Sequence, residues 1–558
     1  MSGRALRAAA LALGLLLPAA SAHAAVITIV NADTAGEGFS DPTGVAPVGG
    51  NPGTTLGAQR LNVFQQAANV WAALLPSTVT IRVQASFDPL TCSANSGVLG
   101  SAGTQTVHRN FTNAEFANTW YPQALANKMA GLDLSTNDDI RARFNKSVDN
   151  STCLGTVSWY YGYDGNEGSN VDLLPVVLHE LGHGLGFSTV VTLANGQQFM
   201  GSPDIFERFL YDNATGKSWL TMTDMERQAS AINLGHVVWS GPAANLHAAN
   251  YLAKRSLVTV SAPAGIAGVY EGGHASFGAP LTTSGVTAGV VLANDGSGTA
   301  SDACTALING AAMSGKIALV DAGTCSDVTK ATRVQAAGAV GMIVVSSAAG
   351  SPPDLNGTAP AITIPLTSVS QANGTTIRNQ LGAGVIATLE IDNTKLAGAD
   401  DAGRLRMYAP NPLVNGSSIS HFDVVATPNL LMEPIINSNL SGVDLTRYAF
   451  EDIGWLPRTT DTSGSGAGVA MLSSAPNPFS SGTTIRMDLA RSGLTKLSIY
   501  DVNGRLVRTL ANAWLPAGQY TLAWDGADDH GVPVRPGVYL SQLRLADAVL
   551  SKRLVRID

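Results

Sequence analysis

The spacing of hydrophobic residues changes several times along the chain, and each change predicts a different kind of element. Apolar residues recur every three to four positions from Ala58 to Leu74, which predicts an amphipathic helix that ends before Pro76. Four shorter apolar runs predict strands: Val26–Val30, Val79–Ala85, Asp139–Phe144 and Val157–Tyr161. A long helix that leads into a strand is typical of the start of an α/β domain.

The composition changes near Leu257, where the chain becomes rich in Ala, Gly and Val. Apolar runs predict strands at Lys316–Val320, Gly341–Val345 and Ala361–Thr367, with a short helix at Val328–Ala337. Past Leu396 the earlier composition returns. We therefore expect an inserted α/β unit over 257–398 that interrupts one domain made of 25–256 and 399–457.

A second break lies at 458–468, where Ser, Thr and Gly without apolar periodicity predict a flexible linker. The remaining residues, 469–558, contain six short alternating runs separated by Gly-, Pro- or Asp-containing turns. Strands at this spacing predict a small β-sandwich. The expected fold class is thus multidomain α+β.

Length, composition and net charge indicate a folded protein of several domains and argue against a nucleic-acid-binding protein. A chain of 558 residues is too long for one ordinary core, and 45 % hydrophobic with 13 % charged residues indicates a folded protein. The net charge of −8, with no basic stripe, argues against a nucleic-acid partner.

The N-terminus predicts export. Arg4 and Arg7 precede a short apolar run, and Ala22-His23-Ala24 supplies the small residues of a cleavage site, so 1–24 is typical of a secretory signal peptide. A membrane anchor is the alternative, but the run is short for a span, and no later stretch is a good span candidate. We expect a bacterial, secreted or cell-surface protein.

Four cysteines suit an oxidising compartment and allow three pairings. Their spacing favours Cys92–Cys153 and Cys304–Cys325, each within its own domain. Zinc binding by these thiols is the alternative, although none lies in a C-x-x-C pair.

The strongest chemical motif is Leu178-His179-Glu180-Leu181-Gly182-His183. Histidines four positions apart lie on one face of a helix, so both imidazoles can bind one zinc ion. Three protein ligands would leave a position for water, and Glu180 can take the proton of that water as general base. Peptide-bond hydrolysis is the natural outcome.

The setting of this motif supports its interpretation. Asp172 can cap the helix, Pro175 suits its first turn, and the residues between Asp172 and His179 are otherwise apolar enough to be buried. We expect Gly182, Gly184 and Gly186 to let the chain stop and turn after His183. The alternative is an ordinary core helix whose polar groups are satisfied.

The sequence His179-Glu180-Leu181-Gly182-His183-Gly184-Leu185-Gly186-Phe187 resembles the metzincin clan of zinc peptidases. Their short-spaced pattern places a third His where this chain has Thr189. In the leishmanolysin-like branch the third His follows an insertion and precedes a Met-turn. This chain is similar: the resemblance implies His421 as third ligand and Met432, within Pro428–Pro434, beneath the metal.

Other histidines remain candidates for the third ligand. His236 and His247 are the main substitutes, whereas His108, His274 and His530 lie in less suitable segments. The 421 − 183 = 238 positions between the last two expected ligands exceed what a compact domain needs, and the insert explains most of them.

Two further resemblances concern the other domains. Residues 315–325, with Lys330, 335–341 and Ile364-Pro365, resemble a protease-associated (PA) domain, which implies a lid or substrate-positioning module, with a folded spacer as the alternative. The C-terminal motifs Pro476-Asn477-Pro478-Phe479, 499–505 and Trp524-Asp525-Gly526 resemble immunoglobulin-like domains of flagellar hook-capping proteins and of type IX secretion cargo. This implies contact with export machinery or the cell surface, with carbohydrate binding as the alternative.

We therefore expect a secreted zinc metalloendopeptidase that acts on protein or peptide substrates and does not span a membrane. An adhesin or matrix-binding protein with a non-catalytic zinc site, and a zinc amidase or esterase, are the competing functions. The sequence leaves a role for calcium open.

Overall fold

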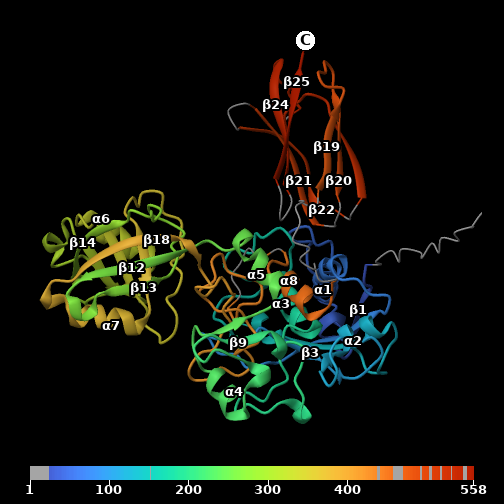
Figure 1. Ribbon diagram of the computed structural model, residues 1–558, viewed down its shortest axis with the longest axis horizontal. Coiled ribbons are helices and arrows are strands. Elements are labelled where there is room, and N and C mark those ends of the chain that lie inside the picture. Colours follow the sequence, from blue (N-terminus) through green and yellow to red (C-terminus); the bar gives the residue numbers. More distant parts are fainter. Residues whose placement is uncertain are drawn as a thin grey trace, which may run out of the picture. The chain divides into compact units, whose positions relative to one another are not determined.

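The computed structural model describes residues 24–150, 152–435, 440, 442–456, 469–489, 493–501, 505–515, 518–529, 531–544 and 549–557. The predicted signal peptide, except Ala24, and the predicted linker 458–468 lie outside these residues. The described residues form two compact units, the first made of 24–245 and 253–456 and the second of 246–252 and 469–557 (Figure 1). No helix among them has the length and apolar character that a membrane crossing requires.

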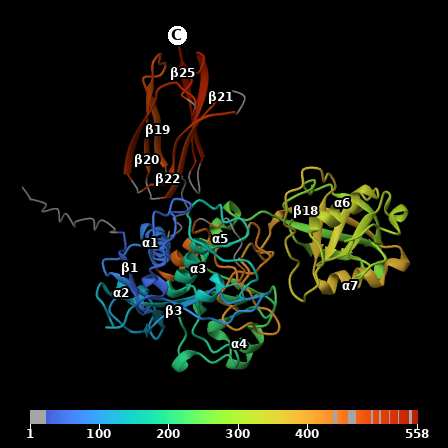
Figure 2. The ribbon, with the colours of Figure 1, turned by 180° about the vertical axis from the view of Figure 1, so that it is seen from behind.

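The first unit opens with a four-stranded sheet of order β1-β2-β6-β3. Strands β1 (Ile27–Asn31), β2 (Ile81–Asp88) and β6 (Ile140–Asn145) are parallel, and β3 (Gly100–Thr104) runs antiparallel to β6 at the edge. Helices α1 (Leu56–Leu74) and α3 (Leu173–Leu185) pack on this sheet and on each other (Figure 2). Most of these elements were predicted, but β3 was missed because its sequence, GSAGT, lacks an apolar alternation.

Short elements surround this sheet and complete the part of the unit that carries the HELGH motif. They are β4 (Val107–His108), β5 (Tyr121–Pro122), α2 (Gln123–Ala130), β7 (Trp159–Tyr160), β8 (Val171–Asp172), β9 (Leu210–Asp212), β10 (Lys217–Ser218), α4 (Asp224–Ser230), β11 (Val237–Trp239) and α8 (Thr446–Ile453), together with α5 (Pro242–His247), whose last two residues belong to the second unit.

The inserted segment forms a seven-stranded sheet of order β13-β12-β18-β14-β15-β16-β17. Its strands are β12 (Lys254–Ala262), β13 (Gly268–Gly272), β14 (Val286–Leu292), β15 (Ile317–Asp321), β16 (Gly341–Val345), β17 (Leu366–Val369) and β18 (Ile386–Leu396). Strands β14 to β17 are parallel, and β12, β13 and β18 pair antiparallel. Helix α6 (Asp327–Ala336) connects the parallel strands β15 and β16, and α7 (Gln371–Asn379) connects β17 to the antiparallel strand β18.

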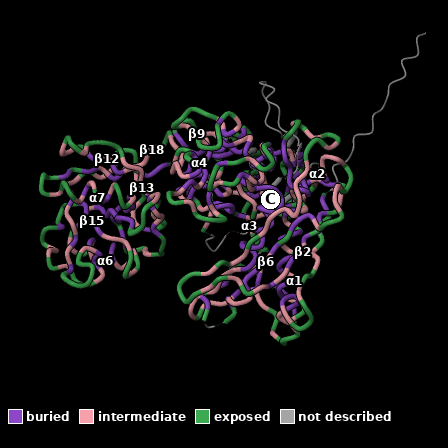
Figure 3. Tube along the Cα trace, turned by 90° about the horizontal axis from the view of Figure 1, so that it is seen from below, coloured by how far each residue is buried: buried purple, intermediate pink, exposed green. Residues whose placement is uncertain are grey.

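Both faces of the inserted sheet are covered, which explains the continuous apolar runs of its strands. Ala318 and Val320 pack in one core cluster, whereas the alternating Ile317 and Leu319 pack in another. Figure 3 shows the buried residues inside this sheet and the exposed residues on its outer loops.

The two ends of the insert lie side by side, because the Ala397 N–H donates to the Ala253 carbonyl at 2.9 Å. The sheet begins at Lys254, three residues before the predicted boundary, since Lys254 and Arg255 already pair with β18. Because the inserted segment leaves and re-enters the first domain at the same place, that domain can fold around it without a break.

The second unit contains two antiparallel sheets, of order β19-β20-β23 and β22-β21-β24-β25. Their strands are β19 (Val469–Ala475), β20 (Thr483–Leu489), β21 (Gly493–Asp501), β22 (Leu506–Leu515), β23 (Gly518–Trp524), β24 (Gly537–Arg544) and β25 (Val549–Arg556). Side chains of both sheets, among them Ile485, Trp524 and Leu497, share one core. The β-sandwich expected from the spacing of the runs is present.

Candidate metal centre

Helix α3 carries the HELGH motif and is buried along its whole length. The Asp172 carboxylate accepts a hydrogen bond from the Leu174 N–H at 3.1 Å and so caps the first turn, as predicted. The helix ends at Leu185, and the φ of 125° at the following residue, Gly186, favours glycine.

The expected role of the other two glycines is wrong, because the helix continues through Gly182 and Gly184. A Cβ at Gly182 would lie 2.7 Å from Met432 Sδ, and one at Gly184 would lie 2.4 Å from Ile140 Cγ2. Both positions need glycine because another part of the core approaches the helix closely, and not because the chain turns there.

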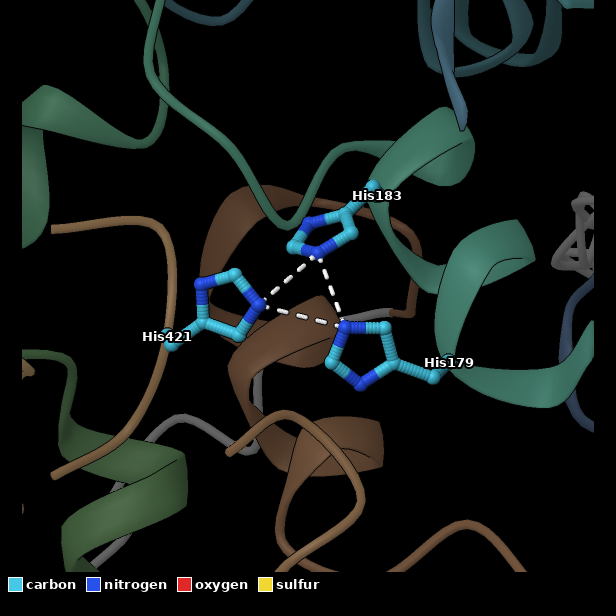
Figure 4. Close-up of side chains that lie close together, drawn as sticks. All are labelled: His179, His183 and His421. Atoms are coloured by element: carbon cyan, nitrogen blue, oxygen red, sulfur yellow. Dashed lines mark hydrogen bonds between the residues drawn. The ribbon is translucent and has the colours of Figure 1, made fainter. Parts of the chain in front are cut away.

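The structure brings His421 to the two histidines of α3 (Figure 4). The Nε2 atoms of His179 and His183 are 3.1 Å apart, and each lies 3.2 Å from the Nε2 of His421. All three side chains are buried, with exposed fractions of 4 to 8 %.

Each imidazole has a backbone carbonyl on its other nitrogen. The Nδ1 atoms of His179, His183 and His421 lie 2.6, 2.8 and 2.7 Å from the carbonyl oxygens of Leu431, Phe187 and Ser417, respectively. A carbonyl only accepts hydrogen bonds, so each Nδ1 carries the proton and each neutral Nε2 presents a lone pair.

Burial keeps these imidazoles neutral. It lowers the pKa of His179 to about 3 and that of His183 to about 4, and it lowers the pKa of His421 well below its usual value. Three lone pairs thus face one another without a donor between them, which is unfavourable unless a cation lies among them.

This donor set fits zinc. Three nitrogens bound to one tetrahedral zinc at about 2.0–2.1 Å lie about 3.3–3.4 Å from one another, close to the observed separations. Among the residues that the structure describes, only this triad brings together three or more His, Cys, Asp or Glu ligand atoms within 4.8 Å of one another. The role left open for calcium stays a prediction.

Glu180 lies between α3 and the edge strand β3. Its carboxylate accepts a hydrogen bond from the Ala102 N–H, and burial raises its pKa to about 8 despite this bond. A Cβ at Gly100 would lie 3.1 Å from the Glu180 Cγ, so glycine there leaves room for the side chain. A nearby cation would favour the carboxylate form.

Met432 is fully buried. Its sulfur lies against Gly182, the residue that precedes His183 in the motif. The Phe422 N–H donates to the Met432 carbonyl at 2.8 Å, which joins the turn to the segment of His421. The sequence placed Met432 beneath the site only through a resemblance, and this packing is consistent with it.

The substitute ligands lie elsewhere. The Thr189 hydroxyl donates to Asp204, the exposed His236 contacts Asn213, and His108 contacts Thr106. His247 and His274 are not part of the triad, and His530 lies outside the described residues.

The sequence interpretation missed the groups that orient the ligands. The carbonyls of Leu431, Phe187 and Ser417 belong to the backbone, so no residue type marks them. The two predicted disulfides, Cys92–Cys153 and Cys304–Cys325, are confirmed, and both pairs are excluded as zinc ligands.

Comparison with known families identifies two of the domains. The model of the PA domain matches residues 286–377, and that of the FlgD Ig-like domain matches 478–547. The chain is thus a multidomain α+β protein with a PA domain and a C-terminal Ig-like domain, as two of the resemblances predicted. A third family model, described as SPBPB7E8-like, matches 59–209, which includes α3 but not His421.

Solved structures with local likeness include a zinc aminopeptidase from Bacillus subtilis (22 % identity, 27 % of this chain and 36 % of that chain, TM-score 0.19). A second is an aminopeptidase from Aneurinibacillus sp. strain AM-1 (22 % identity, 25 % of this chain and 31 % of that chain, TM-score 0.20). A third is FlgD from P. aeruginosa (22 % identity, 13 % of this chain and 60 % of that chain, TM-score 0.12). The chain spans about a third of the length of these aminopeptidases. Among curated proteins, none matches the chain.

Proposed function

We propose that this chain is a secreted zinc endopeptidase of the leishmanolysin-like metzincin type. His179, His183 and His421 bind the zinc ion, and Glu180 acts as general base. The observation that carries the proposal is the convergence of three Nε2 lone pairs, each set by an Nδ1–H bonded to a backbone carbonyl.

Zinc bound by three imidazoles polarises a substrate carbonyl and makes water more acidic. The Glu180 carboxylate accepts the proton of the attacking water and returns it to the nitrogen of the leaving amine. The hydrogen bond from Ala102 orients this carboxylate, and Met432 supplies an apolar floor that excludes water from beneath the histidines.

The edge strand β3 supports a peptide as substrate. The Ala102 N–H donates to Glu180 and so does not pair with β6. In an antiparallel strand every second residue faces its partner, so Ala102 and its alternate residues direct their N–H and C=O groups away from β6. An extended peptide can add to this edge through main-chain hydrogen bonds to outward groups other than the Ala102 N–H, beside the general base. A non-protein amide or ester has no such strand to add.

Export and the roles of the outer domains are also parts of the proposal. The 1–24 segment is the signal peptide, the PA domain positions large substrates, and the Ig-like domain contacts export machinery or the cell surface.

Casein zymography of the purified protein, with and without a chelator and after zinc is restored, tests the function. We expect hydrolysis that the chelator abolishes and zinc restores. A protein that binds zinc but cleaves neither casein nor peptides would favour the adhesin or matrix-binding alternative. Peptides with both ends blocked distinguish the proposed endopeptidase from an aminopeptidase, and simple esters and amides test the remaining alternative.

A further inference from the structure

One turn, residues 430–433, connects two of the three histidines. The Leu431 carbonyl accepts the Nδ1–H of His179, and the Met432 carbonyl accepts the N–H of Phe422, which follows His421. The backbone orientation of this turn therefore determines both contacts.

Asp444 anchors the turn from outside. It lies thirteen residues beyond Leu431, just before α8, and its Oδ2 accepts the Leu431 N–H. Its Oδ1 accepts the N–H and the hydroxyl of Thr446 at 3.1 and 3.0 Å, which fixes the carboxylate.

Glu433, within the turn, holds Leu430, the residue before Leu431. Its Oε1 accepts the Leu430 N–H at 2.7 Å, and its Oε2 accepts the Asn429 side-chain amide at 2.6 Å. Glu433 is 2 % exposed, so water does not compete for these bonds.

Fixing Leu431 matters for metal binding because of the tautomer of His179. If the Leu431 carbonyl rotates away, nothing holds the proton of that imidazole on Nδ1. The other tautomer carries the proton on Nε2, which then has no lone pair to offer. Outer partners of this kind typically change metal affinity by about 10–100-fold.

We propose that Asp444 is a positioning residue for His179. It acts through Leu431, with Glu433 holding Leu430, and so sets the affinity of the triad for zinc. This inference rests on the proposed metal site, and it assigns a role to a carboxylate that touches neither the metal nor the substrate.

The test compares Asp444→Asn with a matched control, Asp452→Asn, in the full-length protein. Asp452, in α8, is a buried carboxylate that accepts the Trp239 Nε1–H and the backbone N–H groups of Ala243 and Ala244. Zinc affinity is measured by competition with a chelating dye, and the coordination geometry by the visible spectrum of the Co²⁺-substituted protein.

Asp444→Asn should lower zinc affinity about 10–100-fold and alter the Co²⁺ spectrum. Asp452→Asn should lower the melting temperature but leave both metal readouts unchanged. Equal zinc affinities for Asp444→Asn and the wild type would overturn the inference.

A second variant covers the case in which Asp444→Asn does not fold. Glu433→Gln replaces one carboxylate oxygen with an NH2 group, which cannot accept the hydrogen bond of the Asn429 side-chain amide. Zinc affinity should again fall. An unchanged zinc affinity contradicts the inference. Failure of the wild type to bind zinc would contradict the proposed function itself, which separates the two outcomes.

Discussion

At the residue scale, the site depends on where single protons lie. Three imidazoles are held in one tautomer by three carbonyls, and Glu180 is held by one backbone N–H. Substitutions at these residues should therefore change chemistry while the surrounding core stays folded.

Glu180→Gln should keep zinc and lose hydrolysis by about 10²–10⁴-fold, because the amide cannot accept the proton of water. The measurements are zinc content and kcat/KM on a blocked peptide. Turnover near that of the wild type would show that another group is the base.

His421→Ala should lower zinc affinity by more than about 100-fold, beyond the usual effect of losing an outer partner, and abolish activity. His236→Ala and His247→Ala are the matched controls and should bind zinc normally. If one of these two proved essential and His421 dispensable, the leishmanolysin-like assignment would be wrong.

At the scale of elements, α3 is a helix whose neighbours approach its backbone. The sheet contributes Ile140 and the turn contributes Met432, and both contact the helix where a side chain is absent. Geometry at the site is therefore coupled to how closely these elements pack.

Gly184→Ala tests this coupling. Alanine favours a helix by about 1 kcal/mol, but the new methyl would overlap Ile140, and overpacking costs about 1–3 kcal/mol. We expect a lower melting temperature and weaker zinc binding. The control is Gly382→Ala in the insert, where a Cβ meets no atom within 4 Å. A higher melting temperature for Gly184→Ala would contradict the close approach of Ile140 to the helix.

The insert is the second element to test. Its loop contacts the segment of His421: the Ser351 hydroxyl donates to Asp423 at 3.3 Å, and the Thr427 hydroxyl donates to Asp354 at 3.1 Å. Arg406, whose carbonyl accepts the Asp423 N–H, also pairs with Glu271 of the insert at 2.6 Å. We expect the insert to contribute to the stability of this segment through these three contacts without being required for the fold.

Replacing residues 254–396 with a short Gly/Ser bridge should leave a folded, zinc-binding protein, because Ala253 and Ala397 are already hydrogen-bonded. Activity on casein should change more than activity on a short peptide. The double variant Ser351→Ala/Asp354→Ala, in the full chain, measures the part due to the two contacts. An insoluble or zinc-free product would show that the insert is integral to the core.

At the scale of the whole molecule, the two compact units have separate cores, and only the first contains the histidine triad. A ligand stabilises the unit that binds it by about 2.7 kcal/mol at a free concentration of 100 times Kd.

A chelator should therefore lower the unfolding temperature of the first unit and leave that of the Ig-like domain unchanged. Calorimetry with and without chelator measures this, and restored zinc should reverse it. A chelator that moved neither transition, or both equally, would contradict a zinc site confined to the first unit.

The sequence alone predicted what depends on local spacing. The helix of the HELGH motif, its Asp172 cap, the pairing of four cysteines, strands β15 and β16 of the insert and six strands of the sandwich follow from periodicity and separation along the chain. The run expected at Ala361–Thr367 overlaps β17 by only two residues, and the other strands of the insert were not predicted. His421 and Met432 came from a resemblance, since no local pattern joins them to α3.

Only the tertiary structure decided the rest. It brought His421 to α3 across 238 positions, placed Glu180 against β3, and showed that Gly182 and Gly184 serve close packing. It also identified Asp444 and the three carbonyls behind the imidazoles. The physical reason is that most of these contacts join groups far apart in the chain, whereas the backbone carbonyls among them are chemically alike at every residue. No local pattern therefore marks the partners before the chain folds.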